Sequence, residues 1–267
     1  MRGADDKMNI IVFIKQVPDS DQVRLDDNGN LIREGVQSMI NPVDKNAIEA
    51  GLELKDKFGG KVTAVTMGPP QAVEVLKRAL FMGCDDVVLL SDRAFGGADT
   101  LATGYTLAKA AEKIGGYDLL IFGNRAADAE TAQTGPVTAG FLGLPLVTSV
   151  SALEAAEGCI FCTRNFTRGI EKCRVKLPAV ITVKPELNTP RFQTPANVIS
   201  GLKKEIKVWD CAALGCDASR TGVSGSPSRT KRVVAPPSRS VDTETISGSN
   251  EEMAKAFVDI LAGEHLI

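Results

Sequence analysis

The residues with the clearest chemical potential form a polar loop rich in small side chains, from Gly123 to Gly135 (GNRAADAETAQTG). The loop follows an apolar run over 117–122 that is typical of a buried strand, and it leads into a helical pattern. Backbone N–H groups at the start of a helix are free and carry partial positive charge, so such a loop favours a bound phosphate. The segment therefore predicts a site for a phosphorylated ligand.

Two further loops of this kind follow apolar runs. Residues 66–70 (TMGPP) follow the run 61–65, and residues 91–100 (SDRAFGGADT) follow the run 87–90. One such loop is weak evidence, because turns after strands use glycine for geometric reasons. Three of them, at the carboxyl ends of parallel strands, would open on one edge of a sheet, where ligands of such sheets bind. We expect one nucleotide site at that edge.

The residues around these loops indicate how a nucleotide would be held. The backbone at 17–19 and at Asn41 would present carbonyls and amides to an adenine edge. Arg125 would balance phosphate charge. The predicted binding residues are Val17, Pro18, Asp19, Asn41, Thr66, Met67, Gly68, Asp99, Thr100, Ala102, Thr103, Gly123, Asn124, Arg125, Asp128, Thr131, Gln133 and Thr134.

Some of these residues also have a purely structural interpretation. Asp99, Thr100 and Thr103 would hold ribose or ribityl hydroxyls and pyrophosphate. Asp99 and Thr100 would equally serve as helix caps, and capping does not exclude contact with a ligand. For Asp128 and Glu130 the alternative is a solvated loop face.

Several common nucleotide-binding and catalytic motifs are absent from the sequence, which limits the chemistry that the chain could perform. The usual Rossmann glycine pattern is missing after the first strand, where the chain reads KQVPD, and no P-loop lysine motif occurs. His265 is the only histidine, which excludes a Ser-His-Asp triad, a histidine base and most catalytic zinc sites. Cys159, Cys162 and Cys173 suggest a metal site, but their run alternates like a hairpin strand and lacks a nearby fourth ligand. We predict no catalytic residue and no metal.

The composition indicates one main domain with residues left over. The chain has 267 residues, and 43% of them are hydrophobic. The net charge of −2 argues against nucleic acid as a partner. Because there is neither an apolar run of membrane-spanning length nor a signal-peptide pattern, we expect a cytoplasmic protein. Residues 1–7 are polar and are interpreted as a leader outside the fold.

The first 150 residues alternate between two patterns. Apolar runs occupy 9–17, 61–66, 87–90, 117–122 and 146–150, and helical patterns begin near residues 42, 70, 99 and 131. Pro42 and Pro70 suit a first helical turn, and we expect Asp44 to cap the first helix. Strands alternating with helices predict an α/β fold, a doubly wound, Rossmann-like parallel sheet.

The pattern changes after Val150. Segments 151–153, 159–167 and 171–176 are typical of antiparallel strands, and 179–183 of one more buried strand. We therefore expect a nucleotide- or flavin-binding domain over residues 8–185, with a small antiparallel addition to its sheet.

The C-terminal part has little material for a core of its own. Residues 219–249 are rich in Ser, Arg, Pro and Thr, so that segment alone could not offset its ordering entropy. An amphipathic helix follows, with Asn250 as the expected cap and a stripe of Met253, Phe257, Ile260 and Leu261. We expect 219–267 to be an arm that docks on another subunit. The alternative is an arm folded back on its own domain.

Several motifs together carry a family resemblance. They are KQVPD at 15–19, INPVDKNAIEA at 40–50, VTAVTMGPPQA at 62–72, SDRAFGGADTLAT at 91–103 and GNRAADAETAQTGP at 123–136. With these, residues 8–183 resemble the β subunit of electron-transfer flavoprotein, and segments 188–208 and 225–229 resemble later parts of that family. The resemblance implies a heterodimer with an α subunit that carries a redox FAD. The β subunit then holds either AMP or a second FAD.

The resemblance also bears on partners. It implies that residues 186–218 form a partner-contact segment, in which the region near 190–200 touches a dehydrogenase. Pro195 stands where related chains can carry a leucine anchor. The dehydrogenase would be of the acyl-CoA type or act on a 2-hydroxyacid. The C-terminal arm would dock on the α subunit.

Residues 92–103 are similar to the electron-bifurcating branch, whose β subunits bind a redox-active FAD there and take hydride from NADH. This implies FAD and NAD(H) in the β subunit, and ferredoxin or flavodoxin as a further partner. Asn124 and Arg125 depart from that branch, which often reads Arg-Gln at these places. Whether the chain is itself an enzyme stays open, since the flavin would carry the reaction. The alternatives are an AMP-binding β subunit that only transfers electrons, and a non-redox adenine-nucleotide-binding regulatory module.

Overall fold

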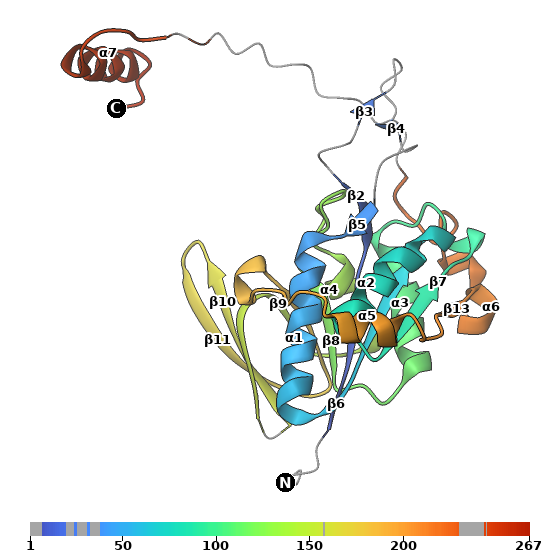
Figure 1. Ribbon diagram of the computed structural model, residues 1–267. Coiled ribbons are helices and arrows are strands. Elements are labelled where there is room, and N and C mark those ends of the chain that lie inside the picture. The colour runs from blue at the N-terminus through green and yellow to red at the C-terminus, as the bar shows by residue number, and fades with distance from the viewer. Residues whose placement is uncertain are drawn as a thin grey trace. The chain divides into compact units, whose positions relative to one another are not determined.

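The computed structural model describes residues 7–19, 24–25, 31–32, 38–156, 158–229, 243 and 245–267. Within them the chain forms a nine-stranded sheet in the order β11-β10-β9-β12-β8-β1-β6-β7-β13 (Figure 1). Its strands are β1 (Met8–Phe13), β6 (Gly60–Met67), β7 (Asp86–Leu90), β8 (Leu119–Gly123), β9 (Leu146–Ala156), β10 (Cys159–Phe166), β11 (Gly169–Lys176), β12 (Ala179–Val183) and β13 (Lys207–Trp209). From β9 to β13 all neighbours pair in parallel, which confirms the predicted α/β fold.

Helices cover both faces of the parallel sheet. Ile10 and Val12 of β1 lie in one apolar core with α1 (Pro42–Phe58) and α2 (Val73–Met82). Ile11 and Phe13 lie in the other, with α3 (Thr100–Ile114) and α4 (Thr134–Leu142). Because both faces are covered, these strands read as continuous apolar runs rather than as an alternation.

The first apolar run is not one strand, as predicted for 9–17, but two. β1 ends at Phe13, and β2 (Gln16–Pro18) pairs antiparallel with β5 (Ser38–Ile40) in a separate two-stranded sheet. The backbone at Lys15 leaves the main sheet because its N–H donates to the carboxylate of Asp44, at 2.7 Å. A further short pair joins β3 (Arg24–Leu25) and β4 (Leu31–Ile32).

The predicted start of α1 near residue 42 is confirmed, but its cap and the start of α4 are corrected. Asn41, not Asp44, occupies the cap position of α1, and Asp44 lies in the first turn of the helix, buried, as an acceptor for Lys15 and Asn41. α4 begins at Thr134 rather than near Thr131, since Gln133 is its cap residue and Ala132 has a positive φ of 55°. A left-handed residue of this kind cannot continue an α-helix.

The antiparallel addition is confirmed, with one change. The predicted strands 146–150 and 151–153 form the single strand β9, in which Ser149 has a φ of 59° and the pairing register shifts. β10 pairs with β9 and β11, and Cys162 faces Cys173 across this hairpin. Burial raises the pKa of the Cys162 thiol to about 12, so this thiol remains protonated.

The chain after β12 packs along the domain. It forms α5 (Pro195–Gly201), β13 at the sheet edge and α6 (Cys211–Leu214). Residues 218–228 then contact the loop after β7: the N–H of Val223 donates to Gly96 O at 3.1 Å. Gly222 has a φ of +51°, and a Cβ there would lie 2.3 Å from Ala94 O, so this close approach requires glycine.

The chain divides into two compact units, Met1–Arg232 and Val233–Ile267. Residues 219–229, which were predicted to begin the arm, thus belong to the first unit. Of the predicted leader 1–7, only Lys7 lies within the described residues. Among the helices that the structure describes, none has the length and apolar character needed to cross a membrane.

The second unit contains the expected amphipathic helix, α7 (Asn250–Gly263). Its cap is Ser249 rather than Asn250, because Ser249 and Glu252 form a reciprocal capping box. The last residue of the helix is Gly263, and Glu264 is its C-cap. Phe257 and Ile260 of the predicted stripe are exposed.

Candidate functional site

The carboxyl ends of β8, β1, β6 and β7 lie side by side at one edge of the sheet (Figure 1). The three loops singled out in the sequence follow β6, β7 and β8, so they open on this edge as expected. Gly68 of the first loop donates its N–H to Leu90 O at the end of β7, at 3.0 Å. The sheet therefore gathers the predicted nucleotide loops in one place.

The loop after β8 is held to the first strand and to α1. Asn41 Nδ2 donates to Arg125 O at 2.8 Å, and the N–H of Ala127 donates to Asn41 Oδ1 at 3.1 Å. The ammonium of Lys15 pairs with Asp128 at 2.6 Å. Sequence reasoning selected Asn41 and Asp128 but missed Lys15, whose charge two residues past β1 was the available signal.

Two buried polar atoms at this edge lack partners. Of the described residues, three have a buried side-chain polar atom without a hydrogen bond: Thr66 Oγ1, Asn124 Oδ1 and Arg164 Nε. Thr66 is 1% exposed, near the end of β6, and Asn124 follows β8, so the first two flank the end of β1. Buried polar atoms in proteins nearly always have partners. A polar ligand such as a nucleotide could supply the missing partners, including a hydrogen-bond donor for Asn124 Oδ1.

Asp99 both caps a helix and holds the chain after residue 222. Its Oδ1 accepts from the N–H groups of Leu101 and Ala102, at 3.0 and 3.1 Å. Its Oδ2 accepts from the N–H and the hydroxyl of Ser228, and its own N–H donates to Ser226 Oγ. Burial works to raise the pKa of Asp99, but these hydrogen bonds outweigh it and keep the pKa below its ordinary value.

Ser226 and Ser228 were missed as site residues. Their motif, GSPSR at 225–229, resembles a later segment of the family, and the sequence predicts that it belongs to the C-terminal arm. The structure places it against the start of α3 instead, beside Thr100, whose hydroxyl donates to Gln133 Oε1 at 3.3 Å. That bond links the loops after β7 and β8.

The remaining predicted residues differ in exposure. The side chains of Val17 and Ala102 are buried at 1% exposure, so only their backbone groups could meet a ligand. Arg125 is exposed and pairs with Glu130. The partly exposed residues are Asp19, Met67, Gly68, Thr103, Gly123 and Thr134, and the exposed ones are Pro18, Asp128, Thr131 and Gln133.

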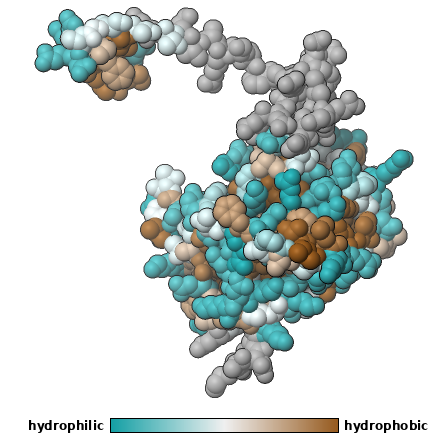
Figure 2. Space-filling model, viewed as in Figure 1, coloured by the Kyte–Doolittle hydropathy of each residue, from teal (hydrophilic) through white to brown (hydrophobic). Residues whose placement is uncertain are grey.

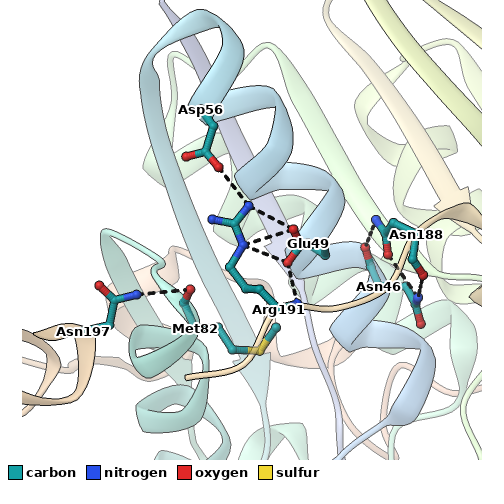
Figure 3. Close-up of polar contacts among 7 residues, drawn as sticks. All are labelled: Asn46, Glu49, Asp56, Met82, Asn188, Arg191 and Asn197. Carbon is teal, nitrogen blue, oxygen red and sulfur yellow. Dashed lines mark hydrogen bonds and ion pairs between the residues drawn. The ribbon is translucent and has the colours of Figure 1, made fainter. Parts of the chain in front are cut away.

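A second polar cluster fastens the segment 185–191 to α1 (Figure 3). The guanidinium of Arg191 makes a bidentate pair with Glu49, from Nε to Oε2 and from Nη2 to Oε1, each at 2.9 Å, and reaches Asp56 at 2.8 Å. One turn away, Asn46 Nδ2 donates to Asn188 O at 2.8 Å, and Asn188 Nδ2 donates to Asn46 O. Glu49 is 4% exposed, so this clamp includes a buried charge with a full set of donors.

The clamp holds a segment whose apolar side chains face solvent. Phe192 is 93% exposed, and Ile199 and Leu202 at α5 are 60% and 67% exposed. Figure 2 shows apolar residues gathered on the face that carries α5. Large exposed side chains on a firmly held segment are typical of a docking surface. This surface lies within the predicted partner-contact segment, residues 186–218.

Comparison with known proteins identifies the family. The model of the electron transfer flavoprotein domain matches residues 28–214. The electron transfer flavoprotein subunit beta of Clostridium acetobutylicum is 43% identical, over 97% of this chain and 100% of its own. The chain belongs to the electron transfer flavoprotein β subunits. The caffeyl-CoA reductase-Etf complex subunit CarD of Acetobacterium woodii is 40% identical over 97% of this chain and 100% of its own. Protein FixA of Bradyrhizobium diazoefficiens is 42% identical over 95% of this chain and 91% of its own.

Membership confirms the resemblance found in the sequence. A β subunit of this family implies an α-subunit partner and binding of flavin or adenine nucleotide within the family. Ligands of open parallel sheets usually bind at the carboxyl ends of the strands, so the gathered loops are the candidate site for such a ligand.

Asp99 should affect two properties of this β subunit separately. Asp99→Ala removes the cap of α3 and should lower the free energy of unfolding by about 1 kcal/mol in urea titrations. Asp99→Asn keeps an oxygen for the cap but turns an amide towards Ser228, so hydrogen exchange at 226–228 should rise while stability changes little. Asp210→Ala, which removes the cap of α6, is the control and should leave exchange at 226–228 unchanged. Equal exchange in Asp99→Asn and the wild type would contradict the anchoring role.

The two acidic residues of the clamp, Glu49 and Asp56, should contribute unequally to the free energy of unfolding. Glu49→Gln removes the buried counter-charge of Arg191 and should lower the free energy of unfolding of this β subunit by about 3 kcal/mol. Asp56→Asn breaks a pair whose acid is 60% exposed, and should cost less than about 1 kcal/mol. Urea denaturation of the two variants and the wild type under identical conditions measures both losses. Equal losses would show that the Glu49 pair is not the main attachment.

Proposed function

We propose that this β subunit binds FAD at the carboxyl edge of its sheet and works in electron bifurcation. In this proposal it accepts hydride from NADH and passes electrons to the α-subunit FAD, and from there to a dehydrogenase. The remaining electrons from NADH go to ferredoxin or flavodoxin. The observation that carries the proposal is the pair of unpartnered buried atoms, Thr66 Oγ1 and Asn124 Oδ1, among the three gathered loops. The similarity of residues 92–103 to bifurcating chains supports FAD over AMP.

The residues of the chain would bind and orient the cofactor. Backbone groups at 17–19 and at Asn41 lie by the end of β1 and suit the adenine edge. Thr100 and Thr103, at the start of α3, would hold hydroxyls and pyrophosphate through their own hydroxyl groups. Arg125 would exchange its exposed partner Glu130 for a phosphate. The bound flavin supplies the hydride and single-electron chemistry, so the chain itself needs no acid, base or nucleophile.

Two exposed apolar surfaces, at 192–202 and on α7, indicate where the partners bind. We assign the exposed side chains at 192–202, held by the clamp on α1, to contact with a dehydrogenase of the acyl-CoA type or one that acts on a 2-hydroxyacid. The name of CarD, a subunit of a caffeyl-CoA reductase-Etf complex, supports an association of this kind. We assign the apolar stripe of α7 to the α subunit, because the described part of its own unit leaves Phe257 and Ile260 exposed.

Counting the cofactors tests the proposed function. The purified αβ complex should release two FAD per heterodimer on acid extraction, and NADH should bleach flavin absorbance. The double variant Asp99→Ala with Thr100→Ala should lose the β-site FAD while the α-site FAD remains. Asp210→Ala, which also removes a helix cap, should keep both. One FAD plus one AMP would instead assign this chain to the electron-transferring members without bifurcation, and a complex with no β-site nucleotide would refute the binding site.

Truncation after Arg232 tests the α7 assignment. Because residues 219–229 pack on the first unit, this cut removes only the second unit. The truncated chain should keep its circular dichroism signal apart from the lost helix, yet fail to co-purify with the α subunit. Within the full chain, Phe257→Ser should weaken α-subunit binding more than Val258→Ser, a matched exposed residue outside the stripe. Unchanged affinity of the truncated chain would mean that the arm folds on its own domain.

A further inference from the structure

A buried carboxyl group lies where three elements meet beside the candidate site. Asp44 is 5% exposed, in the first turn of α1. Its Oδ2 accepts from the N–H of Lys15 at 2.7 Å, and its Oδ1 accepts from Asn41 Nδ2 at 2.9 Å. The backbone of Gly123 also lies close to this carboxyl and favours its ionised form. The end of β1, the start of α1 and the loop after β8 are thus joined through one side chain.

The contact with the loop is close enough to restrict its sequence. A Cβ at Gly123 would lie 2.2 Å from Asp44 Oδ1, which is far inside van der Waals contact. The glycine at the start of the predicted nucleotide loop is therefore required by Asp44, independently of any ligand.

Asn41 extends this arrangement into the loop. Asparagine at a helix cap normally accepts from the first N–H groups of its helix, but Asn41 makes no such bond. Its side chain instead contacts Asp44, Arg125 O and the N–H of Ala127. Asp44 thus fixes the orientation of the amide that holds residues 125–127, just beyond Asn124, whose Oδ1 lacks a partner.

We propose that Asp44 is a positioning residue for the nucleotide site, which sets the place of the loop at 123–127 through Gly123 and Asn41. The inference rests on the proposed function, since the loop it places is the one assigned to the nucleotide. Its physical basis is the set of groups around the carboxyl. The hydrogen bonds to Asp44 all come from N–H donors, so they require a side chain that only accepts.

The ionised and protonated forms of Asp44 differ in this respect. A carboxylate accepts every donor, whereas a protonated carboxyl, or an asparagine, turns one donor of its own against an N–H group. Burial raises the pKa of Asp44 to about 7, and hydrogen bonds from Asn41 and Lys15 oppose the rise. The nearby charges are Lys15 after β1 and, on the loop after β8, Asp128 paired with Lys15 and Arg125 paired with Glu130.

These properties predict two opposite pH trends. The loop should be best ordered above pH 7, where Asp44 is ionised. Stability should run the other way: the pKa in the folded chain is about 7, above the ordinary 3.8. The contribution of this group to stability is therefore complete below pH 3.8 and lost as the pH rises through 7. If Asp44 had only a structural role, the order of the loop and the stability of the chain would change with pH in the same direction.

The test compares the αβ complex of the wild type with Asp44→Asn, and uses Asp56→Asn on the same helix as the matched control. Hydrogen exchange at 123–128, corrected for the intrinsic rate, is measured without added nucleotide from pH 6 to 8.5. FAD binding at the β site is measured over the same range by equilibrium dialysis. At pH 8, Asp44→Asn should show roughly tenfold faster exchange and roughly tenfold weaker FAD binding, as expected for the loss of one buried hydrogen bond.

The pH profile provides a second criterion that needs no variant. In the wild type and Asp56→Asn, protection at 123–128 should fall as the pH drops through 7, whereas Asp44→Asn should show low protection without this inflection. Wild-type protection without an inflection, or equal FAD affinity in Asp44→Asn and the wild type, would overturn the role of Asp44 while leaving the proposed function intact. A wild-type complex that binds neither FAD nor AMP at the β site would refute both.

Discussion

Parallel pairing of β8, β1, β6 and β7 is the constraint on which the rest of this structure depends. Parallel strands end on the same edge, so each loop that follows them must lie beside the others. The helices that return the chain cover both faces, which leaves this edge as the place where polar groups can remain accessible. Buried atoms such as Thr66 Oγ1 then lack a protein partner, because the backbone around them is already paired within the sheet.

The α1 helix connects the two proposed functional regions of the chain. Its first turn carries Asp44, beside the proposed nucleotide loop, and Glu49 follows little more than a turn later, in the clamp on Arg191. A helix transmits position well because its turns are fixed by regular hydrogen bonds. Both regions are therefore positioned from one rigid element, and this gives the proposed partner surface at 192–202 a defined place relative to the proposed flavin edge.

The segment at 222–228 shows how a residue far along the chain completes a site. Ser226 and Ser228 contact Asp99, about 130 positions earlier: Ser226 Oγ accepts from the N–H of Asp99, and Ser228 donates to Oδ2, which the helix cap does not use. Residues 92–103, on which the assignment to the bifurcating branch rests, are therefore held from two sides. The geometry of this loop in the proposed site therefore depends on the placement of that later segment as well as on the loop itself.

The fold class and the edge at which the loops gather could be predicted from the sequence, because apolar periodicity and glycine-bearing turns are local patterns, and the quoted motifs carried the resemblance to the family. Asp99 could be predicted as a candidate cap, since capping depends on residues only two or three positions away. Only the tertiary structure decided that Asp44 is a buried acceptor rather than a cap, that β1 ends at Phe13, and that Ser228 belongs with Asp99. In each of these cases the deciding hydrogen bond joins residues far apart in the chain, and no local pattern records which distant donor a carboxylate will meet.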